Sequence, residues 1–174
     1  MRASPTLRKG VLALHIMASV GWLGAVAGFI VLDVATVASP DAPILRAAYI
    51  GMDLLADWAI VPLAVAALAT GIAISLLTPW GLFRHWWVAI SLALTVAATL
   101  VLLAQMPVIT HRADVARDPA TTDAALGHMG NLLLHSVGGT LVLVVVTVLN
   151  VAKPRGLTRH GWRRLQAEAA AGDP

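Results

Sequence analysis

The sequence predicts an all-α integral membrane protein, a four-helix bundle of up-down-up-down topology. Of its 174 residues, 59% are hydrophobic and only 12% are charged, which is about half the charged fraction of a typical soluble domain. Four segments contain no Asp, Glu, Lys or Arg, and each is long enough to cross a bilayer, because about 20 apolar residues suffice. These segments are 10–32, 58–83, 86–110 and 124–152.

The distribution of charged residues predicts how the bundle is oriented. Nine of the twelve basic residues lie in the amino end, the second loop and the carboxyl tail, whereas the first and third loops hold seven of the nine acidic residues. The positive-inside rule then places both termini in the cytoplasm of a bacterial cell. We expect the basic tail, 157–174, to lie against anionic lipid headgroups of the inner membrane rather than to bind nucleic acid.

The first two helices follow from the first two apolar segments. The first is expected over about 10–33, and it is longer than the hydrophobic region of a signal peptide, so we expect it to remain as a transmembrane helix. The second is expected over about 44–78. Pro62 predicts a kink within it, and the turn residues around Pro79 end it.

The third and fourth helices are expected over about 85–110 and 122–152. The turn that precedes the third helix is short, so the second and third helices form an antiparallel hairpin. Thr122 has the character of a helix N-cap, which starts the fourth helix before its apolar core. Pro154 ends that helix, and residues 1–156 therefore form one transmembrane domain.

His15 is the most informative single residue, because it lies inside the first apolar segment. An ionisable side chain in a membrane is costly and marks a functional site by default, and imidazole is a common ligand of haem iron. Trp22 and Asp33 share its helix face at a period of about 3.6 residues, so Trp22 is expected beside a bound cofactor. The alternative is that His15 only donates a hydrogen bond to a neighbouring helix.

Three other histidines are candidate ligands at different depths. His85 follows Arg84 at the cytoplasmic boundary, whereas His135 lies near the outer surface, seven residues after His128. If the hydrocarbon core is about 30 Å thick, His15 and His135 are separated by roughly 15 Å along the membrane normal. We therefore do not expect those two residues to bind the same iron.

A second group of residues, the outer acid–histidine set, is expected near the outer mouth of the bundle. Carboxylate and imidazole together suit zinc or copper(II). The alternative is that the acids are solvated and serve only the membrane topology. The set consists of Asp33, Asp53, Asp57, His128 and His135.

Several short motifs resemble a group of small bacterial membrane proteins. Leu14-His15 followed by Gly21-Trp22-Leu23-Gly24 resembles the first helix of the four-helix, haem-binding protoporphyrinogen oxidases and the D-type copper-resistance proteins. The segments 78–82 and 153–156 look most like an uncharacterised set within that group. The resemblance implies that His15 is a haem ligand. An essential lysine of the oxidases would fall at Ser91, which cannot replace it, and this argues against that oxidase activity.

The sequence therefore favours a membrane-embedded b-type haem protein that takes part in electron transfer or redox chemistry. If the protein is an enzyme, we expect a haem-dependent oxidoreductase. We expect His15 as one axial ligand and His85 as its partner, with a second haem at His135. Arg84 and Arg155 are expected to pair with the haem propionates. Copper or zinc handling at the outer acid–histidine set is the alternative. A third interpretation is a non-catalytic membrane subunit that packs on a larger complex. The partners expected are a second copy of the chain, in a homodimer, or a membrane redox partner.

Overall fold

The structure is a computed structural model that describes residues 4–171. Within this range there is no β-strand, and the only bridge is an isolated pairing of His85 with Leu157. The helices, in chain order, are α1 (Pro5–Ala38), α2 (Ala42–Leu55), the π-helical η1 (Ala56–Ile60), α3 (Val61–Leu77), α4 (Trp86–Arg117), α5 (Asp123–Gly127), α6 (Leu133–Ala152) and α7 (Arg159–Ala171).

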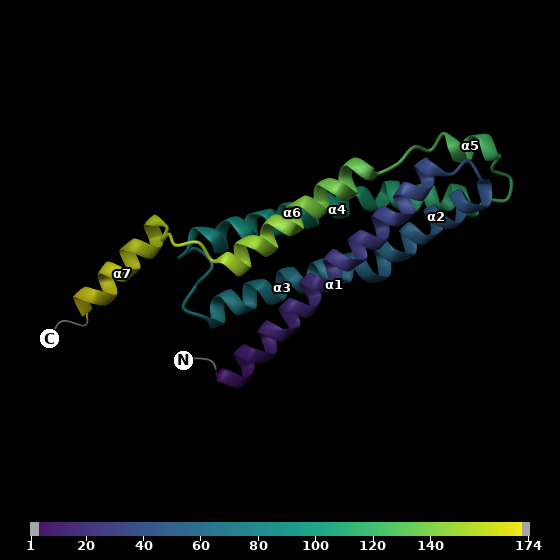
Figure 1. The fold of residues 1–174 in the computed structure, drawn as a ribbon. Coiled ribbons are helices and arrows are strands. Elements are labelled where there is room, and N and C mark those ends of the chain that lie inside the picture. The colour runs from purple at the N-terminus through teal and green to yellow at the C-terminus, as the bar shows by residue number, and fades with distance from the viewer. Residues whose placement is uncertain (1–3, 172–174) are drawn as a thin grey trace.

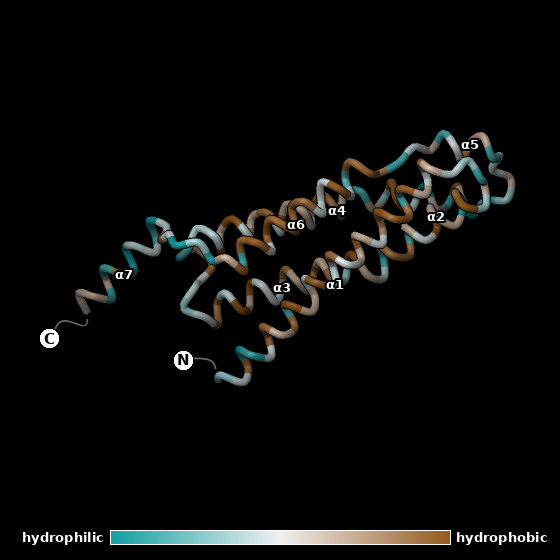
Figure 2. The backbone as a smooth tube through the Cα atoms, in the orientation of Figure 1, coloured by the Kyte–Doolittle hydropathy of each residue, from teal (hydrophilic) through white to brown (hydrophobic). Residues whose placement is uncertain are grey.

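The predicted fold class is confirmed. Four helical units, α1, the continuous α2–η1–α3, α4 and α6, are long and apolar enough to cross a membrane, and they lie side by side as a bundle (Figure 1). Only 11–22% of the residues in the most apolar part of each helical unit are fully buried inside the protein, so the rest are partly or fully exposed and available for contact with lipid. Figure 2 shows this apolar character along the bundle, with polar residues gathered at its two ends. The chain is a multi-pass membrane protein.

The two ends of the bundle differ, and we name each after the helix that it carries. The α5 end holds α5 and the loop from α1 to α2, whereas the α7 end holds α7, the start of α1 and the loop from α3 to α4 (Figure 1). Both α1 and α4 run past their apolar segments towards the α5 end. The charged residues that follow those segments therefore mark where the apolar surface stops, and they do not end the helices.

The expected single helix over 122–152 is wrong, because the chain leaves the helical conformation between α5 and α6. The predicted N-cap is present, since the Thr122 hydroxyl accepts a hydrogen bond from the Ala125 N–H at 3.3 Å. The helix stops one turn later, and Gly130 adopts a left-handed φ of 71°. Its carbonyl accepts a hydrogen bond from the Tyr49 hydroxyl at 2.8 Å. Tertiary partners thus replace the helical hydrogen bonds of this segment.

Pro62 is accompanied by an irregular turn directly before it. Proline has no N–H to donate and its ring crowds the preceding turn. The chain responds with η1, whose i→i−5 pattern is completed by the Val61 N–H donating to the Ala56 carbonyl. The helix then continues as α3, so the predicted disturbance takes the form of a π-helical insertion.

The α5 end holds the largest fully buried side chains of residues 4–171. Tyr49 and Met52 of α2 and Leu126 of α5 are at most 2% exposed, and Arg46 donates hydrogen bonds to the carbonyls of Ala116 at 2.7 Å and Thr121 at 2.6 Å. Burying an apolar side chain stabilises a fold by about 1.5–3 kcal/mol. This end therefore forms a cap that holds α2, α4 and α5 in fixed positions.

Asp33 joins α1 to the start of α6. Its side chain is completely buried, and it accepts hydrogen bonds from the Leu132 backbone N–H at 2.9 Å and from the Ser136 hydroxyl at 3.1 Å. A buried carboxylate is tolerated only when such donors satisfy it.

Replacing Asp33 is expected to destabilise the bundle. Asp33→Ala leaves the Leu132 N–H buried without an acceptor, which lowers the free energy of unfolding by about 1–3 kcal/mol. Denaturation of the detergent-solubilised protein, followed by circular dichroism, measures the change. The exposed Asp57 is the matched control, and Asp57→Ala should change stability by less than about 0.5 kcal/mol. Equal effects of the two substitutions would contradict the role given to Asp33.

Candidate functional site

A cavity of about 670 Å³ at the α7 end brings together two of the predicted site residues, His85 and Arg84. It lies between the loop from α3 to α4 and the linker from α6 to α7. Two indoles and three cationic side chains line it together with the imidazole. The side chains that matter for its chemistry are Trp80, Arg84, His85, Trp87, Lys153 and Arg155.

The linker from α6 to α7 closes this α7-end cavity by pairing with the loop. Lys153 ends α6 in the left-handed conformation, with φ of 44°. The Thr158 N–H then donates to the Arg84 carbonyl at 3.0 Å, and the Trp86 N–H donates to the Gly156 carbonyl at 3.3 Å. These contacts join residues that are 70 and 74 positions apart in the chain, so only the folded protein places Lys153 and Arg155 beside His85.

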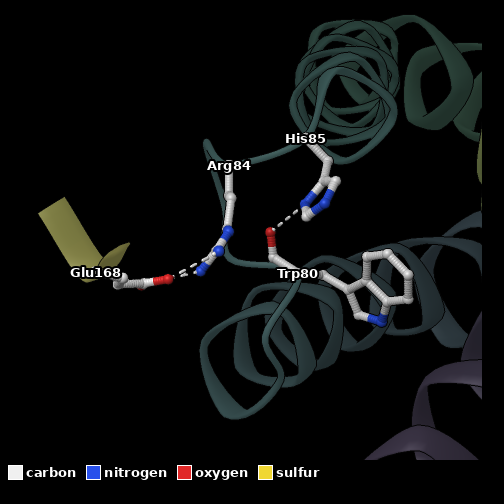
Figure 3. Close-up of polar contacts among 4 residues, drawn as sticks. All are labelled: Trp80, Arg84, His85 and Glu168. Carbon is white, nitrogen blue, oxygen red and sulfur yellow. Dashed lines mark hydrogen bonds and ion pairs between the residues drawn. The ribbon is translucent and has the colours of Figure 1, made fainter. Parts of the chain in front are cut away.

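The His85 ring is held in one orientation. Its Nδ1 lies 2.8 Å from the Trp80 carbonyl oxygen (Figure 3), and its ring meets the Trp80 ring edge to face, with centroids 5.1 Å apart. Because a carbonyl only accepts hydrogen bonds, Nδ1 carries the hydrogen and the lone pair of the neutral ring is on Nε2. A histidine that binds a metal through one nitrogen commonly anchors the other in this way.

The cavity is positively charged. Arg84 points away from His85 and pairs with Glu168 of α7, at 3.1 Å between Nη2 and Oε2 (Figure 3). Lys153 lies over the Trp80 ring, with Nζ 5.6 Å from its centroid, and Arg155 contributes a third cation. One acidic side chain against three cations favours an anionic ligand, or an anionic group on a larger ligand.

His15 contacts the neighbouring helix. Its Nδ1 lies 3.1 Å from both the Ala67 carbonyl and the Thr70 hydroxyl of α3, and its ring packs where Gly71 leaves room, since a Cβ there would stand 3.1 Å from Cε1. This is the interhelical hydrogen bond that the sequence allowed as the alternative. The same contact puts the hydrogen on Nδ1, so binding of iron through Nε2 stays a prediction.

A second cavity, of about 410 Å³, lies among the transmembrane helices, and we call it the intramembrane cavity. Trp22 and His135, both predicted site residues, line it with side chains from α1, η1, α4 and α6. Gln105 of α4 also lines it, and sequence analysis missed this residue. The signal was present, because Gln105 is the only side-chain amide in the apolar segment 86–110.

The expected outer acid–histidine set is not assembled. Within residues 4–171, no three His, Asp or Glu side chains lie close enough to hold a metal ion. Asp33 is engaged with Leu132 and Ser136, and Asp53 pairs with Arg117 at 2.6 Å. His128 Nδ1 lies 2.6 Å from the Ala124 carbonyl oxygen, one helical turn earlier in the chain, and Asp57 is exposed. Folding contacts thus occupy two of the acids that the metal site required.

No protein-family model, curated protein or solved structure matches this chain. The chemistry of the two cavities therefore carries the functional interpretation.

Gly161 is expected to control how α7 docks on the loop from α3 to α4. A Cβ at this position would collide with the Arg84 carbonyl oxygen, so Gly161→Ala should displace α7. Hydrogen exchange should then become faster over α7 and the linker. Gly10→Ala is the control, since no atom lies within 4 Å of a Cβ there. The exposed Arg84–Glu168 ion pair contributes less than about 1 kcal/mol to stability, so Glu168→Gln should speed hydrogen exchange over α7 less than Gly161→Ala does. If exchange in Gly161→Ala is the same as in the wild type, the docking contact is refuted.

Proposed function

We propose that this protein is a membrane-embedded b-type haem protein that binds haem at the α7-end cavity and takes part in electron transfer. The observation that carries the proposal is the composition of that one cavity. It combines an imidazole whose Nδ1 is anchored on a carbonyl, two indoles and three cations. When bound, haem supplies a one-electron redox centre whose potential depends on its axial ligand and surroundings.

Binding of haem b requires three kinds of protein group, and the cavity contains each of them. The iron needs a nitrogen lone pair, which His85 carries on Nε2. The macrocycle needs apolar or aromatic walls, which Trp80 and Trp87 provide, with their ring centroids 5.5 Å apart. The two propionates need cations, which Lys153 and Arg155 supply at the rim.

Arg84 is suited to a supporting role in this site. Its guanidinium is directed towards Glu168 (Figure 3), so it ties α7 to the loop that carries His85. It holds the loop in place and adds positive potential to the cavity, while Lys153 and Arg155 make the charge-assisted hydrogen bonds to the propionates.

The positive-inside rule assigns the α7 end to the cytoplasm of a bacterial inner membrane. The proposed haem then lies at the cytoplasmic face, where a soluble or membrane redox partner reaches its edge. The basic helix α7 and Arg155 present positive charge beside it, which attracts an acidic partner by long-range electrostatics.

The haem proposal is tested by absorption spectra of the detergent-purified, haem-supplemented protein, both oxidised and dithionite-reduced. The wild type should show a Soret band, and His85→Ala should lose most of it because the axial nitrogen is gone. His160→Ala is the matched control, since His160 is an exposed histidine of α7 outside the cavity lining. Lys153→Gln and Arg155→Gln should each weaken haem binding by about tenfold, as expected for a lost charge-assisted hydrogen bond.

Three results would contradict parts of this proposal. A featureless spectrum of the supplemented wild type removes the haem function. A Soret band that is lost in His15→Ala but kept in His85→Ala moves the ligand to α1. Retention of an anionic phospholipid instead of haem, with the same dependence on Lys153 and Arg155, assigns the cavity to a lipid headgroup.

A further inference from the structure

Four polar side chains from three helices line the otherwise apolar intramembrane cavity. They are Trp22 of α1, Gln105 of α4, and His135 and Ser136 of α6, and the Ser136 hydroxyl is already bound to Asp33. Trp22 is only 4% exposed, and its indole carries an N–H that can donate a hydrogen bond. This donor belongs to a buried side chain that lines the cavity.

Unsatisfied polar groups are costly at this position. No water is present in the hydrocarbon core to replace a missing protein partner, and each buried group without one destabilises the fold. Indole, amide and imidazole can all donate a hydrogen bond. A ligand that carries acceptor oxygens would satisfy these donors, whereas a lipid acyl chain would not.

The cavity is accessible from the bilayer. Its lining runs from Phe29, which is 5% exposed, to Val101 and Leu134, which are 51% and 85% exposed on α4 and α6. It therefore reaches the lipid-facing surface between these two helices. Its volume of about 410 Å³ lies within the range of small-molecule sites, which are about 300–1,000 Å³.

The donors lie at different positions along their helices. Trp22 is 11 residues from Asp33 and Gln105 is 6 residues from His111, where Asp33 and His111 are the first ionisable residues of each helix towards the α5 end. At 1.5 Å per residue, these separations are about 16 Å and about 9 Å. A ligand with one polar atom would satisfy one donor, whereas a flat ring with oxygens at opposite edges reaches two levels of the cavity.

We propose that the intramembrane cavity binds a lipid-soluble quinone, a flat ring with two carbonyl oxygens and an apolar tail, that enters from the bilayer between α4 and α6. Trp22 and Gln105 donate hydrogen bonds to the ring oxygens, and the apolar walls enclose the ring. Gly138 and Gly139 keep space for it, because a Cβ at either position would meet no atom within 4 Å.

This site does not depend on the haem proposal. The two cavities share no lining residue, and the chemistry of each is argued from its own side chains. Quinone binding is therefore expected whether or not haem is found at the α7 end.

The test is equilibrium dialysis of a radiolabelled naphthoquinone with a two-isoprene tail against the full-length protein in nanodiscs. We expect saturable binding of one molecule per chain. Gly139→Leu should weaken it at least tenfold, because the new side chain fills the cavity. Gly24→Leu is the matched control, since Gly24 is also a helical glycine with no atom within 4 Å of a Cβ, yet it is exposed and lies outside the cavity lining.

A second variant tests the donor rather than the space. Trp22→Phe keeps an aromatic ring and removes the N–H, so it should weaken binding by about threefold to tenfold, the range for one hydrogen bond. Phytol, an isoprenoid chain without a quinone ring, should displace the probe poorly. The proposal is overturned if the wild type shows no saturable binding, if Gly139→Leu binds as the wild type does, or if phytol competes as well as the quinone.

Discussion

The hydrogen bonds of the buried Asp33 carboxylate are the constraint on which the arrangement of α1 and α6 depends. Asp33 is completely buried and binds the Leu132 N–H and the Ser136 hydroxyl. A carboxylate without such donors would not remain in this position. The pairing fixes where α6 begins, and by holding Ser136 against α1 it also determines that the adjacent His135 lines the intramembrane cavity.

The two ends of the bundle differ in how closely they are packed. At the α5 end, Tyr49, Met52 and Leu126 are buried, and Arg46 ties α2 to the end of α4 and to the loop that follows it. At the α7 end, the loop and linker pair through their backbones and leave a cavity of about 670 Å³ that is lined by cations and indoles. Close packing at one end thus stabilises a bundle whose other end is open enough to hold a ligand.

The membrane explains why polar groups of the two cavities are informative. In water, an exposed Gln or Trp needs no explanation, but inside hydrocarbon each hydrogen-bonding group requires a partner. His15 has one on α3, whereas the buried indole N–H of Trp87, which lines the α7-end cavity, has none among residues 4–171. Our two proposals, haem at the α7 end and a quinone between α1, α4 and α6, follow from where anchored or unsatisfied groups border open space.

The apolar segments by themselves were enough to predict the four-helix membrane fold, because about 20 apolar residues in a row have few other stable conformations. The boundary of the apolar segment 86–110 also drew attention to His85 and Arg84 as site residues, because both lie directly before it in the chain. The break before α6 was missed, although Gly127 and Gly130 are local signals for it. The N-cap at Thr122 is present, and Asp33 and Tyr49 bind the backbone of the segment that follows. The meeting of Lys153 with His85 likewise required the folded linker, because contacts between distant segments are decided by packing and hydrogen bonding and leave no local pattern.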